Sequence, residues 1–207
     1  MPSPGIYKVY GENEYYHIFN RGNNKLIIFR DAQDYKVFLR FFWDLVRQPY
    51  HRKVEAVPDI IPLCYCLMPT HFHLLLKQTT KTGITNLMKR LIIKYVMYFN
   101  KRYKRIGRLF QSAFKAKHVD DEIYLLHLSR YIHLNPIKIW KKSLAQYSYS
   151  SYVNYLRPQS ESLVHTEDIL SFFKLAQRVS LKQAHSYQSF VEDYQSQGIT
   201  LEYGYLG

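Results

Sequence analysis

Two histidines, His71 and His73, flank a phenylalanine in the apolar segment MPTHFHLLLK of a strongly basic chain. Alternate side chains of an extended strand share one face, so both imidazoles point the same way while Phe72 points to the opposite side. Two imidazoles on one face can bind one metal cation. The simpler alternative is a pair of hydrogen-bonded core histidines, so a metal site is favoured only when a further ligand and a reactive group occur nearby.

A tyrosine and an asparagine in the segment LHLSRYIHLNP supply those two groups. Tyr131 and Asn135 are four residues apart, which places them on one face of a helix, one turn from each other. The amide oxygen of Asn135 suits a hard cation such as Mg²⁺ or Mn²⁺, and the phenol of Tyr131 can become a nucleophile. Packing at the edge of the core is the alternative role for Tyr131, because the chain contains 20 tyrosines.

Other tyrosines compete for the role of nucleophile. Tyr124 lies seven residues before Tyr131, on nearly the same helical face, and Tyr95 and Tyr98 belong to a second, basic helix. Tyr131 is favoured because only this tyrosine has an amide ligand one turn further along its helix.

Hydrophobic periodicity and turn residues place these groups on regular elements. Pro69 and Thr70 separate two short strands, so the histidines begin the second strand of a hairpin. Three carboxylates at 120–122 precede the helix that carries Tyr131, as is typical of a helix N-terminus. Strands are expected at 15–21, 61–67, 71–77 and 108–119, and helices at 31–48, 84–105 and 123–135.

This order of elements predicts an α+β fold. It matches a ferredoxin-like antiparallel sheet with helices on one face, plus one extra helix that carries the candidate nucleophile. The polar segment RPQSES, at 157–162, indicates a boundary. We therefore expect one domain at 1–157 and a small, mainly helical appendage at 158–207, with a helix at 165–179.

Composition favours a nucleic-acid partner. The 207 residues include 29 Lys and Arg against 16 Asp and Glu, and 16% are aromatic, so cations can bind phosphates and rings can stack on unpaired bases. A merely basic, soluble protein is the alternative. No apolar run approaches the roughly 20 residues of a membrane-spanning helix, and the amino-terminal segment lacks the apolar core of a signal peptide. Two cysteines are too few for a disulfide framework, which favours a reducing cytoplasm.

Basic residues gather on the predicted long helix at 84–105, which we expect to follow the phosphates of a single strand. A solvated helix face is the alternative interpretation. Three further cations near the predicted strands can extend the same DNA-binding surface. The complete set is Lys89, Arg90, Lys94, Lys101, Arg102, Lys104, Arg105, Arg21, Lys115 and Lys117.

The motifs MPTHFHLLL and RYIHLNP, at their separation in this chain, closely resemble those of the REP-associated tyrosine transposases. These are a branch of the single-tyrosine HUH transposases related to insertion-sequence enzymes. YYHIFNRGNN and GRLFQSAFKAKHVDDE also look like that family's pattern, so the resemblance runs from about residue 15 to 156. It implies an HUH nuclease fold with His71 and His73 as metal ligands, Tyr131 as the nucleophile and Asn135 as the third metal ligand.

The same resemblance implies an activity. Attack by Tyr131 on single-stranded DNA would form a 5′-phosphotyrosine and a free 3′-OH, with Mg²⁺ or Mn²⁺ bound, and a second 3′-OH could reverse the step on a new strand. Hairpins formed by palindromic repeats are the implied substrates. The protein would act as a monomer or a homodimer in DNA transposition and recombination, away from membranes.

Two other readings compete with this one. Cys64 and Cys66 could join His71 and His73 in a structural zinc site, although two cysteines one residue apart on a strand lack the usual knuckle geometry and a closed site leaves no room for substrate. A noncatalytic module that binds single-stranded nucleic acid is the second alternative, because ferredoxin-like sheets with aromatic strands also bind without cutting.

Overall fold

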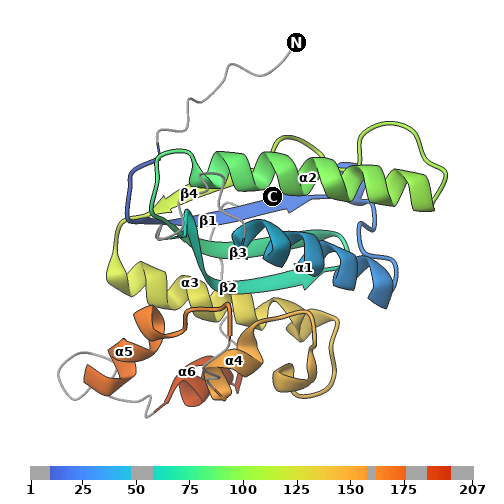
Figure 1. Cartoon of the computed structure of the whole chain (residues 1–207). Coiled ribbons are helices and arrows are strands. Elements are labelled where there is room, and N and C mark those ends of the chain that lie inside the picture. Colours follow the sequence, from blue (N-terminus) through green and yellow to red (C-terminus); the bar gives the residue numbers. More distant parts are fainter. Residues whose placement is uncertain (1–9, 48–57, 158–161, 176–185, 197–207) are drawn as a thin grey trace.

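A computed structural model describes residues 10–47, 58–157, 162–175 and 186–196. Its centre is one four-stranded antiparallel sheet with strand order β2-β3-β1-β4 (Figure 1). The order of elements confirms the predicted ferredoxin-like plan. The strands are β1 (Glu14–Arg21), β2 (Ile60–Met68), β3 (His71–Gln78) and β4 (Lys115–Val119), and the principal helices are α1 (Ala32–Arg47), α2 (Gly83–Arg102) and α3 (Glu122–Leu134).

Helices cover both faces of the sheet. α1 and α2 pack on one face and α3 crosses the other, where it separates the sheet from the carboxyl-terminal helices (Figure 1). Side chains alternate between the two faces along β3, so this strand contributes to the cores on both sides of the sheet. Phe72, Leu74 and Leu76 enter the core under α1 and α2, whereas Leu75 enters the core under α3. The two histidines that begin β3 share the α3 face with Leu75.

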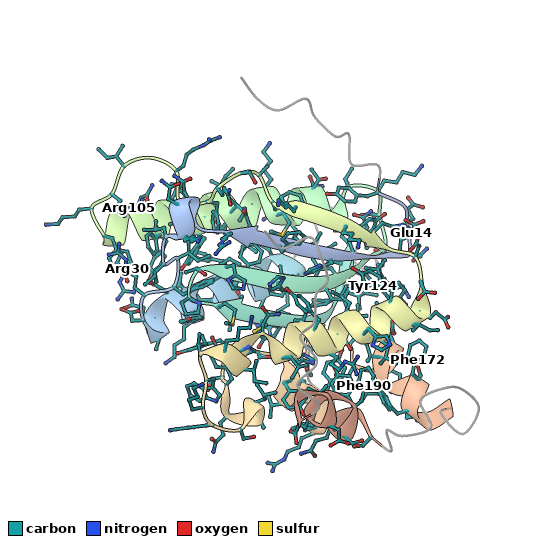
Figure 2. All side chains as sticks on the ribbon, turned by 180° about the vertical axis from the view of Figure 1, so that it is seen from behind. Glu14, Arg30, Arg105, Tyr124, Phe172 and Phe190 are labelled. Carbon is teal, nitrogen blue, oxygen red and sulfur yellow. The ribbon has the colours of Figure 1, made fainter. Side chains whose placement is uncertain are left out.

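The second core joins α3 to the carboxyl-terminal elements. α4 (Tyr152–Leu156), α5 (Glu167–Leu175) and α6 (Tyr187–Ser196) lie beyond α3, with Phe172 and Phe190 directed toward it (Figure 2). The predicted boundary at 157–162 falls largely on residues outside the described ranges, and so does the end of the helix expected at 165–179. Short 3₁₀ turns occupy Asn23–Lys25, Asn135–Lys138 and Leu144–Gln146. No helix within the described ranges is long and apolar enough to span a bilayer.

Two element boundaries differ from the prediction. The fourth strand begins at Lys115 rather than at residue 108, because Phe110 forms only an isolated bridge with Gly22 and the continuous ladder with β1 starts at Lys115. α2 ends at Arg102 rather than at residue 105, since Lys104 adopts a left-handed conformation (φ 50°) and Gly107 follows with φ 91°.

A buried carboxylate joins the beginning of α1 to the end of α2. Asp34 is fully buried, and its carboxylate accepts hydrogen bonds from Arg102 Nη1 (2.6 Å), Tyr98 Oη (2.8 Å) and Tyr103 Oη (2.8 Å). We expect Asp34→Ala to lower the free energy of unfolding by about 2 to 3 kcal/mol, because three partly buried donors lose their buried acceptor. Urea denaturation measures the change. Asp44→Ala, at an exposed position of the same helix, serves as the control and should change stability little.

Candidate active site

The two histidines lie at the first and third positions of β3. Their ring centroids are 5.1 Å apart and their planes are nearly perpendicular. The β2–β3 turn is fixed against the end of β1, where Gly22 N donates to Thr70 O (2.8 Å). A Cβ at Gly22 would lie 2.1 Å from Leu26 O, so only glycine fits at this close approach. This contact sets the position from which the histidines project.

α3 brings the tyrosine and the asparagine to the same histidines. The Tyr131 ring meets the His73 ring edge to face, with centroids 5.6 Å apart. Asn135 Oδ1 lies 3.4 Å from His71 Nε2. The Asn135 amide nitrogen donates to the Tyr131 carbonyl oxygen (2.9 Å), which turns the amide oxygen toward His71. The fold thus brings together two motifs that are about 60 residues apart in the sequence.

The position of α3 is fixed at both ends. At its start, Asp121 accepts a hydrogen bond from Tyr124 N (2.6 Å), which satisfies a free amide of the first turn. Near its end, the fully buried His133 ring contacts Tyr187 Oη (2.7 Å) and Ser151 Oγ (2.9 Å). Burial lowers the pKa of His133 to about 3, so this ring is neutral and anchors the helix rather than carrying charge.

A third histidine, His17 of β1, lies beside the pair, and the sequence analysis did not identify it. His17 Nε2 is 2.9 Å from His73 Nδ1, and the two rings stack with centroids 5.1 Å apart. His17 is 4% exposed. The hydrogen bond occupies Nδ1 of His73 and leaves Nε2 to face the site, which is the arrangement that metal-binding histidines use. Its signal in the sequence was its place among alternating residues of the strand YYHIFNR.

Burial keeps both β3 histidines neutral. The pKa of His73 is well below the ordinary value, first because of burial and then because His17 and His71 are close. Burial also lowers the pKa of His71, against a hydrogen bond that its ring donates to Asn135 Oδ1, and the positive charge of Arg21 lowers it further. A neutral imidazole is the form that binds a metal.

The available donor atoms fit a divalent cation. His73 Nε2 is buried and has no hydrogen-bond partner. An octahedral Mg²⁺ or Mn²⁺ ion with bonds of about 2.1 Å holds neighbouring ligand atoms about 3 Å apart, close to the separation of His71 Nε2 and Asn135 Oδ1. Within the described ranges, no cluster of three or more His, Cys, Asp or Glu residues is placed to hold a metal, and the oxygen beside the histidine pair is that of the Asn135 amide.

The zinc alternative is wrong for the described residues. Cys64 and Cys66 are both present in β2, yet they form no metal-binding cluster with His71 and His73. Burial raises the pKa of both thiols, which keeps them protonated and poor as ligands. Cys66 instead pairs with His73 across the β2–β3 ladder as part of the packed sheet.

Burial raises the pKa of Tyr131 to about 12, and a hydrogen bond with Asn135 opposes that rise. The phenol is therefore protonated at neutral pH. An electrophile or a proton acceptor at the site must assist it before it can attack.

The competing tyrosines lie elsewhere. Tyr95 is fully buried and Tyr98 donates to Asp34, both on the α2 side of the sheet. Tyr124 is on α3, but its ring contacts Lys117, whose amino group lies 4.7 Å from the ring centre. Tyr131 is the one among these candidates whose ring meets His73.

The predicted cations fall on different surfaces. Arg21, Lys115 and Lys117 project from the face of the sheet that carries the histidines. The cations in the body of α2 lie on the opposite side of the sheet (Figure 1). Arg105 lies with Arg30 at the end of the molecule away from Tyr124 (Figure 2). Lys89, Arg90, Lys94, Lys101 and Arg102 belong to α2, and Lys104 and Arg105 follow it.

Arg102 is engaged in structural contacts. Its guanidinium forms ion pairs with Asp31 and with the buried Asp34, both at 2.6 Å. This part of the expected DNA-binding surface therefore contributes to the contact between α1 and α2.

Residues 12–135 match the sequence model of IS200-like transposases. The match covers more than half of the chain and includes all four candidate site residues, so the chain belongs to the IS200-like transposase family. The predicted relationship to insertion-sequence transposases is thereby confirmed. Among curated proteins, none matches the chain.

One solved structure shares the fold. A REP-associated tyrosine transposase bound to a REP hairpin superposes with a TM-score of 0.59 at 12% sequence identity, covering 79% of this chain and 91% of that chain. A candidate transposase from Deinococcus radiodurans R1 gives a TM-score of 0.41 at 17% identity, covering 63% of this chain and 95% of that chain.

The contact between His17 and His73 leads to a prediction about the affinity for a metal ion. We expect His17→Leu to weaken Mn²⁺ binding by about 10- to 100-fold, because His73 loses the hydrogen bond that fixes its orientation. Electron paramagnetic resonance of free Mn²⁺ during titration measures the affinity. His118→Leu, at an exposed histidine of β4, is the control, and equal weakening by both variants would contradict the assignment.

Proposed function

We propose that this protein is a metal-dependent single-stranded DNA endonuclease and strand transferase of the REP-associated branch of its family. Tyr131 is the nucleophile, and His71, His73 and Asn135 are the metal ligands. The observation that carries the proposal is the contact of the Tyr131 ring with His73, whose buried Nε2 has no hydrogen-bond partner, beside His71, whose Nε2 lies 3.4 Å from Asn135 Oδ1.

In the proposed reaction, Tyr131 Oη attacks the scissile phosphorus in line with the bond to the 3′-oxygen. The new Oη–P bond leaves the protein attached to the 5′ end of the downstream strand, and the departing 3′-oxygen takes up a proton. A bound Mg²⁺ or Mn²⁺ supplies polarisation of the phosphate and neutralises its developing charge. The phenol proton passes to solvent or to a neighbouring base, since burial raises the pKa of Tyr131 to about 12 and keeps the phenol of the free protein protonated.

The covalent intermediate conserves the energy of the broken bond. A second 3′-OH can therefore attack the phosphotyrosine and join a new strand without ATP. Asn135 has two roles in this scheme, because its oxygen faces His71 while its amide nitrogen donates to the carbonyl of Tyr131. It links the metal ligands to the nucleophile.

Hairpin DNA with unpaired flanks is the proposed substrate. The match in fold to a transposase bound to a REP hairpin supports this choice. Arg21, Lys115 and Lys117 are the proposed contacts to the phosphates near the cut, because they share a face of the sheet with the histidines. We propose that the cations of α2 bind phosphates more distant from the cut, and that the protein acts in the cytoplasm as a monomer or a homodimer.

The direct test is incubation of the purified protein with hairpins that carry unpaired flanks, in the presence of Mn²⁺. A label at the 3′ end should appear in a covalent protein adduct on a denaturing gel, while a label at the 5′ end should appear in a shorter free strand. A protein that binds these hairpins but forms no adduct with Mn²⁺ or Mg²⁺ would be a noncatalytic binder, and the proposed function would be wrong.

A further inference from the structure

A half-buried phenylalanine lies in the same row of the sheet as the candidate metal ligand His73. The strand register aligns Cys66, His73, Phe19 and Lys115 across the four strands. The Phe19 ring centre is 6.0 Å from that of His73 and 4.8 Å from that of His17. Its ring is partly accessible, on the sheet face that carries the site.

Two cations border this ring. Lys115 Nζ is 5.7 Å from the ring centre of Phe19. Arg21, two residues further along β1, is paired with His71 in the strand register and lowers the pKa of that histidine through its charge. Its Nε is buried without a hydrogen-bond partner. Within the described ranges, neither Arg21 nor Lys115 forms an ion pair with a carboxylate, so both charges are available to a ligand.

We propose that Phe19, Arg21 and Lys115 form a subsite for one unpaired nucleotide next to the scissile phosphate. The base stacks on the Phe19 ring, and Arg21 and Lys115 bind the phosphates on either side of that nucleotide. The subsite rests on the proposed function, because it takes its position relative to the cut from His71 and His73.

The chemistry of the subsite selects an unpaired nucleotide over a paired one. A base in a duplex already stacks on its neighbours, so its faces are covered, whereas a base in a single strand can place a face on an aromatic ring. The position of the ring in the same row as His73 would hold the adjacent phosphate at a fixed distance from Tyr131. The subsite therefore contributes to the choice of the bond that is cut.

The other face of the sheet provides a matched control. Phe41 of α1 is also half-buried, and Lys94 Nζ lies 5.6 Å from its ring centre. This pair has the same residue types, phenylalanine and lysine, as the pair of Phe19 and Lys115. This second pair lies on the α2 side, away from His71 and His73.

The test measures the Kd of a fluorescein-labelled hairpin with unpaired flanks by anisotropy, without a divalent metal, so that no cleavage occurs. We expect Phe19→Leu to weaken binding about tenfold and to leave a blunt duplex of the same stem unaffected. Phe19→Trp should retain the affinity because it keeps a stacking ring, and Phe41→Leu should match wild type. Lys115→Ala should reduce the slope of log Kd against log salt by about 0.7.

Photocross-linking identifies which protein residue contacts the unpaired base. Single 5-iodouracil substitutions through the unpaired flank should give a cross-link at one position, and the modified peptide should contain Phe19. The subsite is wrong if Phe19→Leu binds the flanked hairpin as wild type does, if Phe41→Leu loses as much affinity, or if the cross-linked peptide excludes β1. Adduct formation by wild type separates the two proposals. If wild type forms an adduct and Phe19→Leu binds as wild type does, only the subsite is rejected. If Phe19→Leu binds more weakly and wild type forms no adduct, only the endonuclease is rejected.

Discussion

We expect Tyr131→Phe to abolish the covalent protein–DNA adduct and strand cleavage together, while hairpin affinity stays within about twofold of wild type. The substitution removes a single oxygen, and affinity for DNA comes mainly from phosphate contacts elsewhere. The ring that meets His73 edge to face remains in place, so the packing of α3 on the sheet is kept. Without the phenol oxygen no group can form the phosphotyrosine, and cleavage has no alternative route through this site.

Labelled strands report the two products of cleavage separately in this test. The 3′-labelled strand reports the adduct and the 5′-labelled strand reports the free 3′-OH product, and both signals should be absent for Tyr131→Phe. Tyr124→Phe is the matched control on the same helix and should keep both signals. An adduct that persists in Tyr131→Phe, with the DNA located on Tyr124 by mass spectrometry, would show that the wrong face of α3 had been chosen.

The chain's local patterns predicted most of the fold because each element carries its own signal. Alternation in MPTHFHLLLK placed Phe72 under α1 and α2 and the histidines on the other face, as the two cores require. The carboxylates at 120–122 predicted the start of α3, and Asp121 caps it. The fourth strand was predicted too long because Leu109 and Phe110 are buried by tertiary contacts rather than by alternation.

The features that sequence could not supply depend on register and on partners distant in the chain. His17 becomes a partner of His73 only because β1 pairs with β3 in one particular register, which no pattern within YYHIFNR encodes. Arg102 was grouped with the DNA-binding cations from its place in a basic helix. Its engagement by Asp31 and Asp34 depends on the packing of α1 against α2. The spacing of four residues between Tyr131 and Asn135, by contrast, is local, and it correctly predicted that they lie one turn apart.

The two histidines of β3 are neutral, which is the protonation state that the proposed metal requires of its ligands. Burial lowers the pKa of both rings, so protonation does not compete with a cation near neutral pH. The third proposed ligand is a neutral amide, so the protein contributes no negative charge to the ion through these residues. The net positive charge of a bound divalent cation is then available to the phosphate of the substrate. This arrangement makes loss of either imidazole more severe than loss of the amide.

We therefore expect His71→Ala and His73→Ala each to abolish metal-dependent cleavage while leaving hairpin affinity within about twofold of wild type. Asn135→Ala should instead lower the rate and raise the Mn²⁺ concentration needed for half-maximal cleavage, without eliminating the adduct, because two imidazoles remain to hold the ion. Adduct formation across an Mn²⁺ titration measures both effects. Because His73 is buried, His73→Asn and a thermal unfolding curve accompany the alanine variant to separate loss of the metal site from loss of the fold. Cleavage by either histidine variant at nearly the wild-type rate, with Mg²⁺ or Mn²⁺, would remove that residue from the metal site and leave Tyr131 without the electrophile that its raised pKa requires.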